Sequence, residues 1–334
     1  RDVAVTGVQT CALPIYIGQS KGLGYLRFAS QAAGSPGTVT ITGKTGGACD
    51  ISVGDKTGTW TAATPVGTLD LRGHVASVAA GTLTIGKEDH MGVKESGATG
   101  YVYFDNGAFT TTNLVMGLNI GNNTGVNARA SGTLTIGGGA FTVTTNNAFT
   151  LAYQRGGGSA NATLNLTGGV FRSYSDVLTG PSNCTGVISL NGGALDLTRH
   201  VIGQGAQTVT VFNALSGTLM NVAEFNNGAP IIKTGTGLLT LDGTNTYSGA
   251  TVVSNGVLRL TGGACLPPTA ELYVSSASGA TCQLDYTGSL FIHALFIDGV
   301  QMKGTRYSQV NLPAVFSGTG IIELPYRGTL LLVK

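Results

Sequence analysis

The sequence predicts an all-β chain that folds as a right-handed parallel β-helix with glycine-rich corners. Gly accounts for 53 of 334 residues, more than twice the ~7% of average usage, and charged residues for only 10% against a typical ~25%. Short apolar runs alternate with Thr and small residues and are separated by Gly and Asn, which is typical of strands and turns. Hydrophobic residues make up 42% of the chain, so enough apolar surface exists to offset the entropy of ordering, and disorder is excluded.

A corner pattern occurs seven times between Val78 and Leu258. An apolar or small residue is followed three positions later by Gly and five positions later by a second apolar residue. Side chains alternate faces along a strand, so an offset of five places the two apolar residues on opposite faces unless the chain turns between them. Gly adopts positive φ without steric cost, so we expect each one to join two strands at a corner. The seven corner glycines are Gly81, Gly107, Gly139, Gly169, Gly193, Gly217 and Gly256. A valine at Gly169 should then cost about a few kcal/mol.

The corner glycines are separated by 24 to 39 residues, which is the range of a solenoid repeat. A second strand motif recurs within the period and ends at Gly117, Gly180 and Gly203, with Ala152 in a near copy. A third strand leads to the next corner, so each period contains three strands. About twelve coils, stacked at ~4.8 Å, would form a rod of about 60 Å. The alternative is an antiparallel β-sandwich built from hairpins, because Asn-Gly and Gly-Gly pairs are also strong hairpin signals.

Residues Lys233 to Leu260 read KTGTGLLTLDGTNTYSGATVVSNGVLRL. The order K-x-G-x-G-x-L-x-L-x-G-x-N-T-Y-x-G-x-T resembles the autotransporter-associated β-strand repeat of secreted bacterial surface proteins. The resemblance implies a passenger-like β-helix, at the outer-membrane surface or outside the cell. Residues 295–307 and 316–321 resemble the closing segment of such proteins.

The first residues are interpreted separately, because Val5 to Ile15 resembles the translation of a sequencing-library adapter. We interpret residues 1–16 as derived from that adapter, and the chain as a metagenomic fragment whose signal peptide was lost by truncation. Residues 17–77 are then expected to form the N-terminal coils of a truncated β-helix. Residues 78–260 form the repeat region, with the autotransporter-associated repeat at 233–260, and residues 261–334 form the closing coils.

Charge and cysteine content exclude several functions. A net charge of +2 without a basic run offers no field for nucleic acid. No window of about 18 apolar residues is present, so we expect no transmembrane helix. No CxxC pair or nucleotide-binding motif occurs, and we expect no metal and no cofactor. Cys265 and Cys282 could form a disulfide in an oxidising compartment, or could be small buried thiols.

An enzyme is the alternative function, since extracellular β-helices include polysaccharide lyases and glycoside hydrolases. Such an enzyme needs paired carboxylates, or carboxylates around calcium with a basic residue nearby. The candidate catalytic residues are Glu88, Asp89, His90, Asp176, Asp196 and Arg199. The first three belong to a charged run that also fits a solvated loop, and the last three fit surface ion pairs.

Tyrosines provide the remaining candidate site. A carbohydrate-stacking stripe could be formed by Tyr101, Tyr103, Tyr153, Tyr174 and Tyr247, although half-buried strands also favour Tyr. The sequence therefore favours a non-enzymatic, extracellular stalk or adhesin-like protein. Its expected partner is a surface polysaccharide or a neighbouring or host cell surface.

Overall fold

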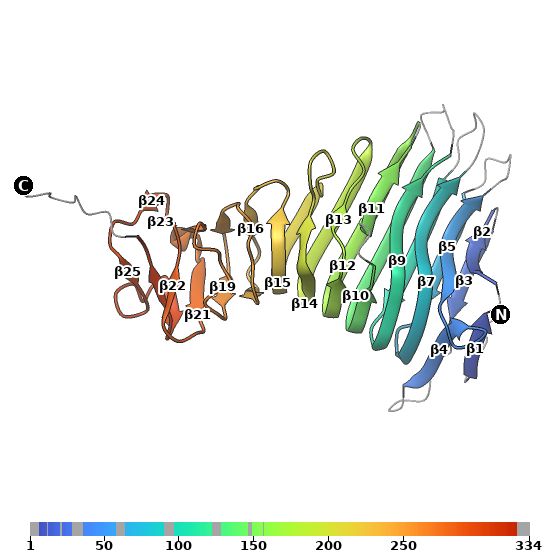
Figure 1. Cartoon of the computed structure of the whole chain (residues 1–334), viewed down its shortest axis with the longest axis horizontal. Coiled ribbons are helices and arrows are strands. Elements are labelled where there is room, and N and C mark those ends of the chain that lie inside the picture. The colour runs from blue at the N-terminus through green and yellow to red at the C-terminus, as the bar shows by residue number, and fades with distance from the viewer. Residues whose placement is uncertain are drawn as a thin grey trace, which may run out of the picture.

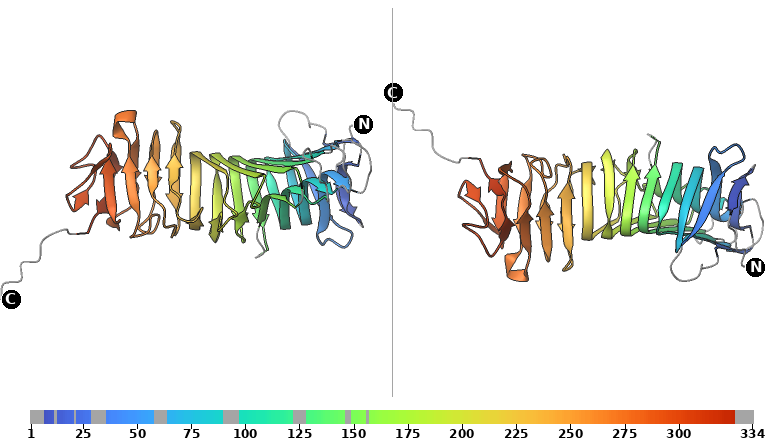
Figure 2. Two further views of the ribbon diagram at one scale, coloured as in Figure 1. Left: turned by 90° about the horizontal axis from the view of Figure 1, so that it is seen from above. Right: turned by 90° about the horizontal axis from the view of Figure 1, so that it is seen from below.

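The protein is an elongated rod of parallel β-strands that lie across its long axis (Figure 1). The computed structural model describes residues 7–11, 13–20, 22–28, 36–57, 64–89, 97–121, 128–145, 149–155 and 157–325. Views from above and below show the strands side by side from the N-terminal to the C-terminal end (Figure 2). Nearly every strand pairing is parallel, so the predicted β-helix is confirmed and the antiparallel sandwich is wrong.

Three parallel ladders run along the rod, and we number them in the order in which a coil visits them. The first ladder is continuous from the first coils to the C-terminal end. Its strands are β3 (Leu23–Arg27), β6 (Val66–Asp70), β8 (Gly97–Phe104), β10 (Arg129–Val143), β12 (Ser159–Ser173), β14 (Cys184–Ile202), β15 (Val211–Phe225), β16 (Ile231–Lys233), β18 (Thr251–Val253), β20 (Glu271–Val274) and β23 (Ala294–Ile297).

The second ladder follows the corner in each coil and contains twelve strands in the described residues. This count agrees with the expected number of coils. Its strands are β1 (Gly7–Cys11), β4 (Gly37–Gly43), β7 (His74–Asp89), β9 (Gly107–Asn119), the second parts of β10, β12, β14 and β15, β17 (Leu238–Asp242), β19 (Val257–Leu260), β21 (Thr281–Leu284) and β26 (Phe316–Gly318).

The third ladder closes the coils from the N-terminal end as far as Phe225. It gives these coils three sides, and Figure 1 shows longer strands here than toward the C-terminal end. Its strands are β2 (Ile15–Gln19), β5 (Cys49–Thr57), the ends of β7 and β9, β11 (Phe149–Gln154), β13 (Val177–Leu178) and the ends of β14 and β15. Strand β1 and the start of β2 lie within residues 1–16 and pair in register with β4 and β5.

In the core, side chains at equivalent positions of successive coils stack on one another. One row on the second ladder is apolar across ten coils, and its phenylalanine rings stack, with centroids 4.6 Å apart for Phe109 and Phe141 and 5.5 Å for Phe141 and Phe171. Such aromatic contacts add to the free energy of burial. The row contains Ile41, Val78, Phe109, Phe141, Phe171, Leu195, Leu219, Leu241, Leu260 and Leu284.

Five of the seven predicted corner glycines have positive φ: Gly107, Gly139, Gly169, Gly217 and Gly256. At the fifth corner in chain order, Gly192 (φ 119°) takes this conformation in place of Gly193. The prediction is wrong for Gly81, which lies where β7 passes from the second ladder to the third and whose φ is not positive. In that coil the corner residue is Gly73 (φ 75°).

A row of aligned glycines, which we call the glycine seam, lies where the first and third ladders of the N-terminal coils approach each other closely. Gly54, Gly86 and Gly117 are aligned on the third ladder with φ of 69°, 73° and 54°. A Cβ atom on Gly86 would lie 2.0 Å from the carbonyl oxygen of Ser131 on the facing ladder. The two backbones are therefore in direct contact, and only glycine fits. Ala152, the residue of the near copy of the motif, is aligned with Gly117 and has φ of 65°, so it takes the same left-handed conformation as an exception to glycine.

The C-terminal end departs from the parallel pattern. β23 pairs antiparallel with β24 (Val300–Gln301), and β25 (Arg306–Tyr307) pairs antiparallel with β27 (Ile321–Glu323), which is parallel to β22 (Ser289–Phe291). A 3₁₀ turn covers Ser276–Ser278. Cys265 and Cys282 are buried free thiols, so the disulfide is not formed and the cysteines pack as small apolar residues.

Candidate functional site

The charged run at the end of β7 is a strand and not the solvated loop that the sequence suggested. Alternation along β7 turns Lys87 and Asp89 outward, where they form an ion pair of 3.3 Å, and buries Glu88 completely. Glu88 lies opposite Lys56 on the third ladder, and that lysine is also fully buried. His90 lies outside the described residues.

A buried polar row passes through these two side chains and continues on the next coils. Asn119 follows Glu88 in register and Gln154 follows Asn119. The Asn119 amide donates to the carbonyl oxygens of Ala128 at 3.1 Å and Ser159 at 3.2 Å. This row therefore links the third ladder to the first at one edge of the rod. Glu88 belongs to this buried row and does not face the solvent.

Asp176 and Asp196 accept hydrogen bonds from neighbouring coils. Asp176 accepts from His200 Nδ1 at 3.1 Å, and Asp196 accepts from Arg172 Nε at 2.9 Å and from Asn221 Nδ2 at 2.9 Å. Burial alone would raise the pKa of Asp196, but the hydrogen bonds from Asn221, Arg172 and the Thr198 N–H outweigh it and hold that pKa below its usual value.

The six candidate catalytic residues do not form one cluster in the described structure. Along the second ladder, β7 and β14 are separated by β9, β10 and β12, so Glu88 and Asp196 lie four rungs or about 19 Å apart along the rod. Arg199 is exposed, with φ of 73°. Its neighbour Thr198 has φ of 48°, and the Asp196 carboxylate accepts from the Thr198 N–H. Asp196 thus stabilises a tight left-handed turn.

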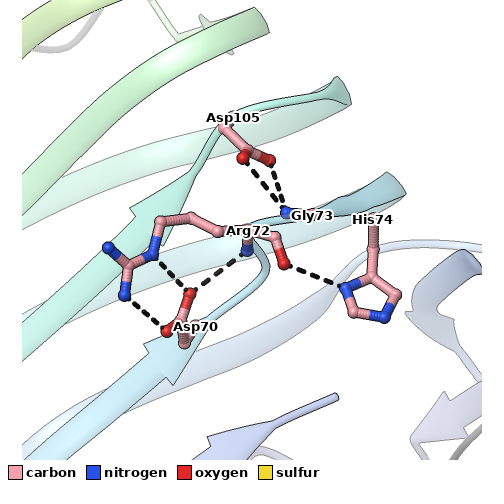
Figure 3. Close-up of polar contacts among 5 residues, drawn as sticks. All are labelled: Asp70, Arg72, Gly73, His74 and Asp105. Atoms are coloured by element: carbon pink, nitrogen blue, oxygen red, sulfur yellow. Dashed lines mark hydrogen bonds and ion pairs between the residues drawn. The ribbon is translucent and has the colours of Figure 1, made fainter. Parts of the chain in front are cut away.

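A charged and aromatic corner lies between β6 and β7 (Figure 3). The Arg72 guanidinium donates to both carboxylate oxygens of Asp70 at 2.8 and 2.7 Å, and it covers the Tyr103 ring at 4.3 Å from the centroid. Burial alone would raise the pKa of Asp70, but the bonds from Arg72 outweigh it and lower that pKa. The Asp105 carboxylate accepts from the Gly73 N–H at 3.0 Å and fixes the corner that the sequence pattern missed.

The solvent-facing side of the first ladder between β6 and β15 carries three aligned rows of mostly uncharged polar side chains, and we call it the hydroxyl face. Alternation along each strand turns these side chains outward and the aliphatic ones inward. The rows are Thr99, Ser131, Asn161 and Thr185; Thr68, Tyr101, Thr133 and Thr163; and Tyr103, Thr135, Asn165, Ser189 and Asn213.

A polar groove of about 450 Å³ borders the hydroxyl face. It shares Asn161 and Thr185 with the face, and Arg129, Ser159 and Asn183 contribute further polar groups. Of the predicted tyrosine stripe, Tyr101 and Tyr103 lie on the hydroxyl face, while Tyr174 is exposed elsewhere. Tyr247 is fully buried, so the prediction of an exposed ring is wrong for it.

Lys233 occupies a core position on the first ladder, between Ala214 and Val253. Its side chain is fully buried, and its ammonium donates to the carbonyl oxygens of Thr234 at 2.7 Å, Gly235 at 2.8 Å and Asn255 at 3.1 Å. Burial lowers the pKa of the ammonium. Because Asn255 belongs to the next coil, Lys233 joins two consecutive corners.

Asn245 joins three coils. Its side-chain oxygen accepts from the Val222 N–H at 2.9 Å, and its amide donates to the carbonyl oxygens of Asp242 at 3.1 Å and Cys265 at 2.9 Å. Residues 231–260 match the family model of the passenger-associated-transport-repeat. The chain therefore carries an autotransporter-associated repeat, and Lys233 and Asn245 are buried structural residues of it. No curated protein and no solved structure matched the chain.

The other distinctive residues of the passenger-associated-transport-repeat also have packing roles. Tyr247 forms a hydrogen bond of 2.7 Å with the Thr251 hydroxyl inside the rod. A Cβ atom on Gly249 would lie 2.1 Å from the carbonyl oxygen of Ala229 on the preceding coil. The sequence signature thus describes how one coil attaches to its neighbours. The part of the chain that the structure describes contains no helix with the length and apolar character of a membrane span.

Proposed function

We propose that the chain is a non-enzymatic, passenger-type β-helical stalk of a secreted or cell-surface protein. The observation that carries this proposal is the buried network of the passenger-associated-transport-repeat, in which Lys233 and Asn245 bind backbone groups of adjacent coils. The repeat family implies a secreted or surface location. A continuous ladder with an apolar core is the architecture of a rigid spacer.

The hydrogen bonds that the candidate carboxylates accept from the protein itself also support a structural role. Asp196 accepts one hydrogen bond from its own turn and two from neighbouring coils, and Asp176 is paired with His200. A general acid or nucleophile must instead face a substrate from a cleft together with a second carboxylate. These side chains are occupied in holding coils together.

Surface display tests the proposal. The chain is placed as passenger between a signal peptide and a translocator in a Gram-negative host, and protease-resistant protein at the surface is quantified. Lys233→Met and Asn245→Ala should each lower that amount at least severalfold, because the coil junction loses buried hydrogen bonds. Lys303→Met, at an exposed position, is the matched control. Surface levels equal to the parent for both variants would contradict the proposal.

The alternative function is a polysaccharide lyase or glycoside hydrolase. Incubation of the purified chain with a polysaccharide panel distinguishes it from the stalk. New reducing ends, or unsaturated products, that disappear in Asp176→Asn would establish the enzyme and overturn the structural role.

A further inference from the structure

We propose that the hydroxyl face binds a neutral polysaccharide that runs along the rod. The face has polar groups to offer, because few of its side chains are bonded to each other. Among the described residues, the hydrogen bonds within its rows are Asn165 Nδ2 to Thr135 Oγ1 at 3.5 Å and Asn213 Nδ2 to Ser189 Oγ at 3.1 Å. Thr133 and Thr163 have no side-chain partner in that part of the chain. Their hydroxyls are free to bind solvent or a ligand.

The spacing of the rows suits a polymer. Parallel strands are ~4.8 Å apart, so a chain lying along the rod meets a new hydroxyl or amide group on every coil. Each of these groups can donate as well as accept a hydrogen bond, as can the hydroxyl groups of a sugar. Many weak contacts in register add to a useful affinity without a deep pocket.

The distribution of charged side chains on the hydroxyl face favours a neutral ligand. The charged side chains Arg27, Asp70 and Arg72 lie together at the N-terminal end of the face, where Arg72 is bonded to Asp70. The three rows from β8 to β15 carry hydroxyl, amide and aliphatic groups. A polyanion such as nucleic acid would require rows of Lys and Arg, and a stable protein interface would have an apolar, aromatic-rich core.

Tyr101 supplies the stacking surface that sugars need. Its ring is nearly parallel to that of Tyr103, with an interplanar angle of 8° and centroids 6.4 Å apart. Arg72 covers one face of Tyr103, so Tyr103 supports the site and the ring offered to a sugar is that of Tyr101. Tyr25, on β3, extends the row of Tyr101 toward the N-terminal end and is 61% exposed. A tyrosine ring packs against the C–H face of a pyranose while its hydroxyl stays hydrated.

The polar groove provides a place for a branch or chain end. It opens beside Asn161 and Thr185 along the edge of the first row, from β10 to β14, and begins one strand away from the tyrosines of β8. Its lining is polar, with Arg129 as its charged group. The binding surface therefore extends from Tyr101 along the rows to this groove. This proposal goes beyond the stalk and does not depend on how the chain is exported.

Affinity electrophoresis of the full chain tests the inference. Gels contain a β-1,3-glucan, xylan, galactomannan, heparin or double-stranded DNA. We expect retardation by at least one neutral polysaccharide, unchanged between low and high salt because no counterions are released. Tyr101→Ala should weaken that retardation about fivefold to tenfold, and Thr163→Lys should weaken it through bulk and charge in the row. Tyr174→Ala, an exposed tyrosine outside the face, should behave as the parent.

Both variants replace outward-facing side chains, and circular dichroism melting checks that they fold. If Tyr101→Ala does not fold, Thr163→Lys alone decides. Absence of retardation by every neutral polysaccharide would overturn the inference, as would retardation that is the same in both variants. Salt-sensitive binding to heparin or DNA alone would show that the face selects anions, and would also overturn it.

Discussion

Substitution of Gly169 measures the cost of a side chain at a corner. Gly169 has φ of 64°, and a Cβ atom on it would lie 2.5 Å from the carbonyl carbon of Gly138 and 2.5 Å from the carbonyl oxygen of Gly139. Positive φ costs alanine about 1 kcal/mol. The contact with the preceding rung adds about 1 to 3 kcal/mol, because backbone must move to admit the methyl group. Gly169→Ala should thus destabilise the protein by about 2 to 4 kcal/mol, and Gly169→Val by more.

Two exposed glycines separate these contributions. Gly46 has φ of 79° and open space around its Cβ position, and Gly47 has open space without positive φ. For 334 residues the entropy of unfolding is about 0.7 kcal/mol/K, so 1 kcal/mol shifts Tm by about 1.4 °C. Thermal melting followed by circular dichroism should give a loss of about 3 to 6 °C for Gly169→Ala, about 1 °C for Gly46→Ala and almost none for Gly47→Ala. Equal melting of the first two variants would refute the contact between rungs.

Three further variants or conditions test the interior. Lys233→Met should cost about 2 to 4 kcal/mol in urea unfolding because three carbonyl oxygens lose their charged donor, whereas Lys303→Met should leave the midpoint unchanged. Ala152→Gly should change the free energy of unfolding by less than about 1 kcal/mol, since relief of the φ of 65° is offset by the loss of a buried methyl group and by the greater freedom of glycine in the unfolded chain; a loss of about 2 kcal/mol or more would contradict a strained backbone at this position. Burial raises the pKa of Cys282 from 9.0 to about 12, so stability should be lost as pH rises above 9. This thiol contributes up to about 1.4 kcal/mol per pH unit, and a titration of Cys282→Ala that keeps the full slope would contradict that assignment.

The coil architecture could be predicted because its determinants are local. At five corners, the glycine and its two apolar residues form a pattern only six residues long. The order of residues in this pattern alone requires a turn between two strands. Gly81 shows the limit of this reasoning. It satisfies the same pattern but lies at a different corner, because which ladder a strand joins depends on residues about 30 positions away.

The candidate site could not be predicted to the same extent. Lys87, Glu88 and Asp89 read as a solvated run, and the burial of Glu88 follows from Lys56 on the preceding coil. Contacts between coils are absent from any short window of sequence. Thr133 and Thr163 likewise read as ordinary strand residues, and only the register places them in one outward-facing, half-buried row.

The inward-facing rows keep their register over most coils, with shifts confined to the corners and bulges, and this constrains how the length of such a chain can change. The segment from Gly139 to the residue before Gly169 corresponds to one complete coil, since Ala140 pairs with Val170 and Phe141 with Phe171. Removing that segment as a unit would bring equivalent positions of the remaining coils together, whereas removing a few residues would slip inward side chains to the outside. Rods of this kind can therefore lengthen or shorten in steps of one coil, by duplication or loss of whole gene segments, without redesign of the interior.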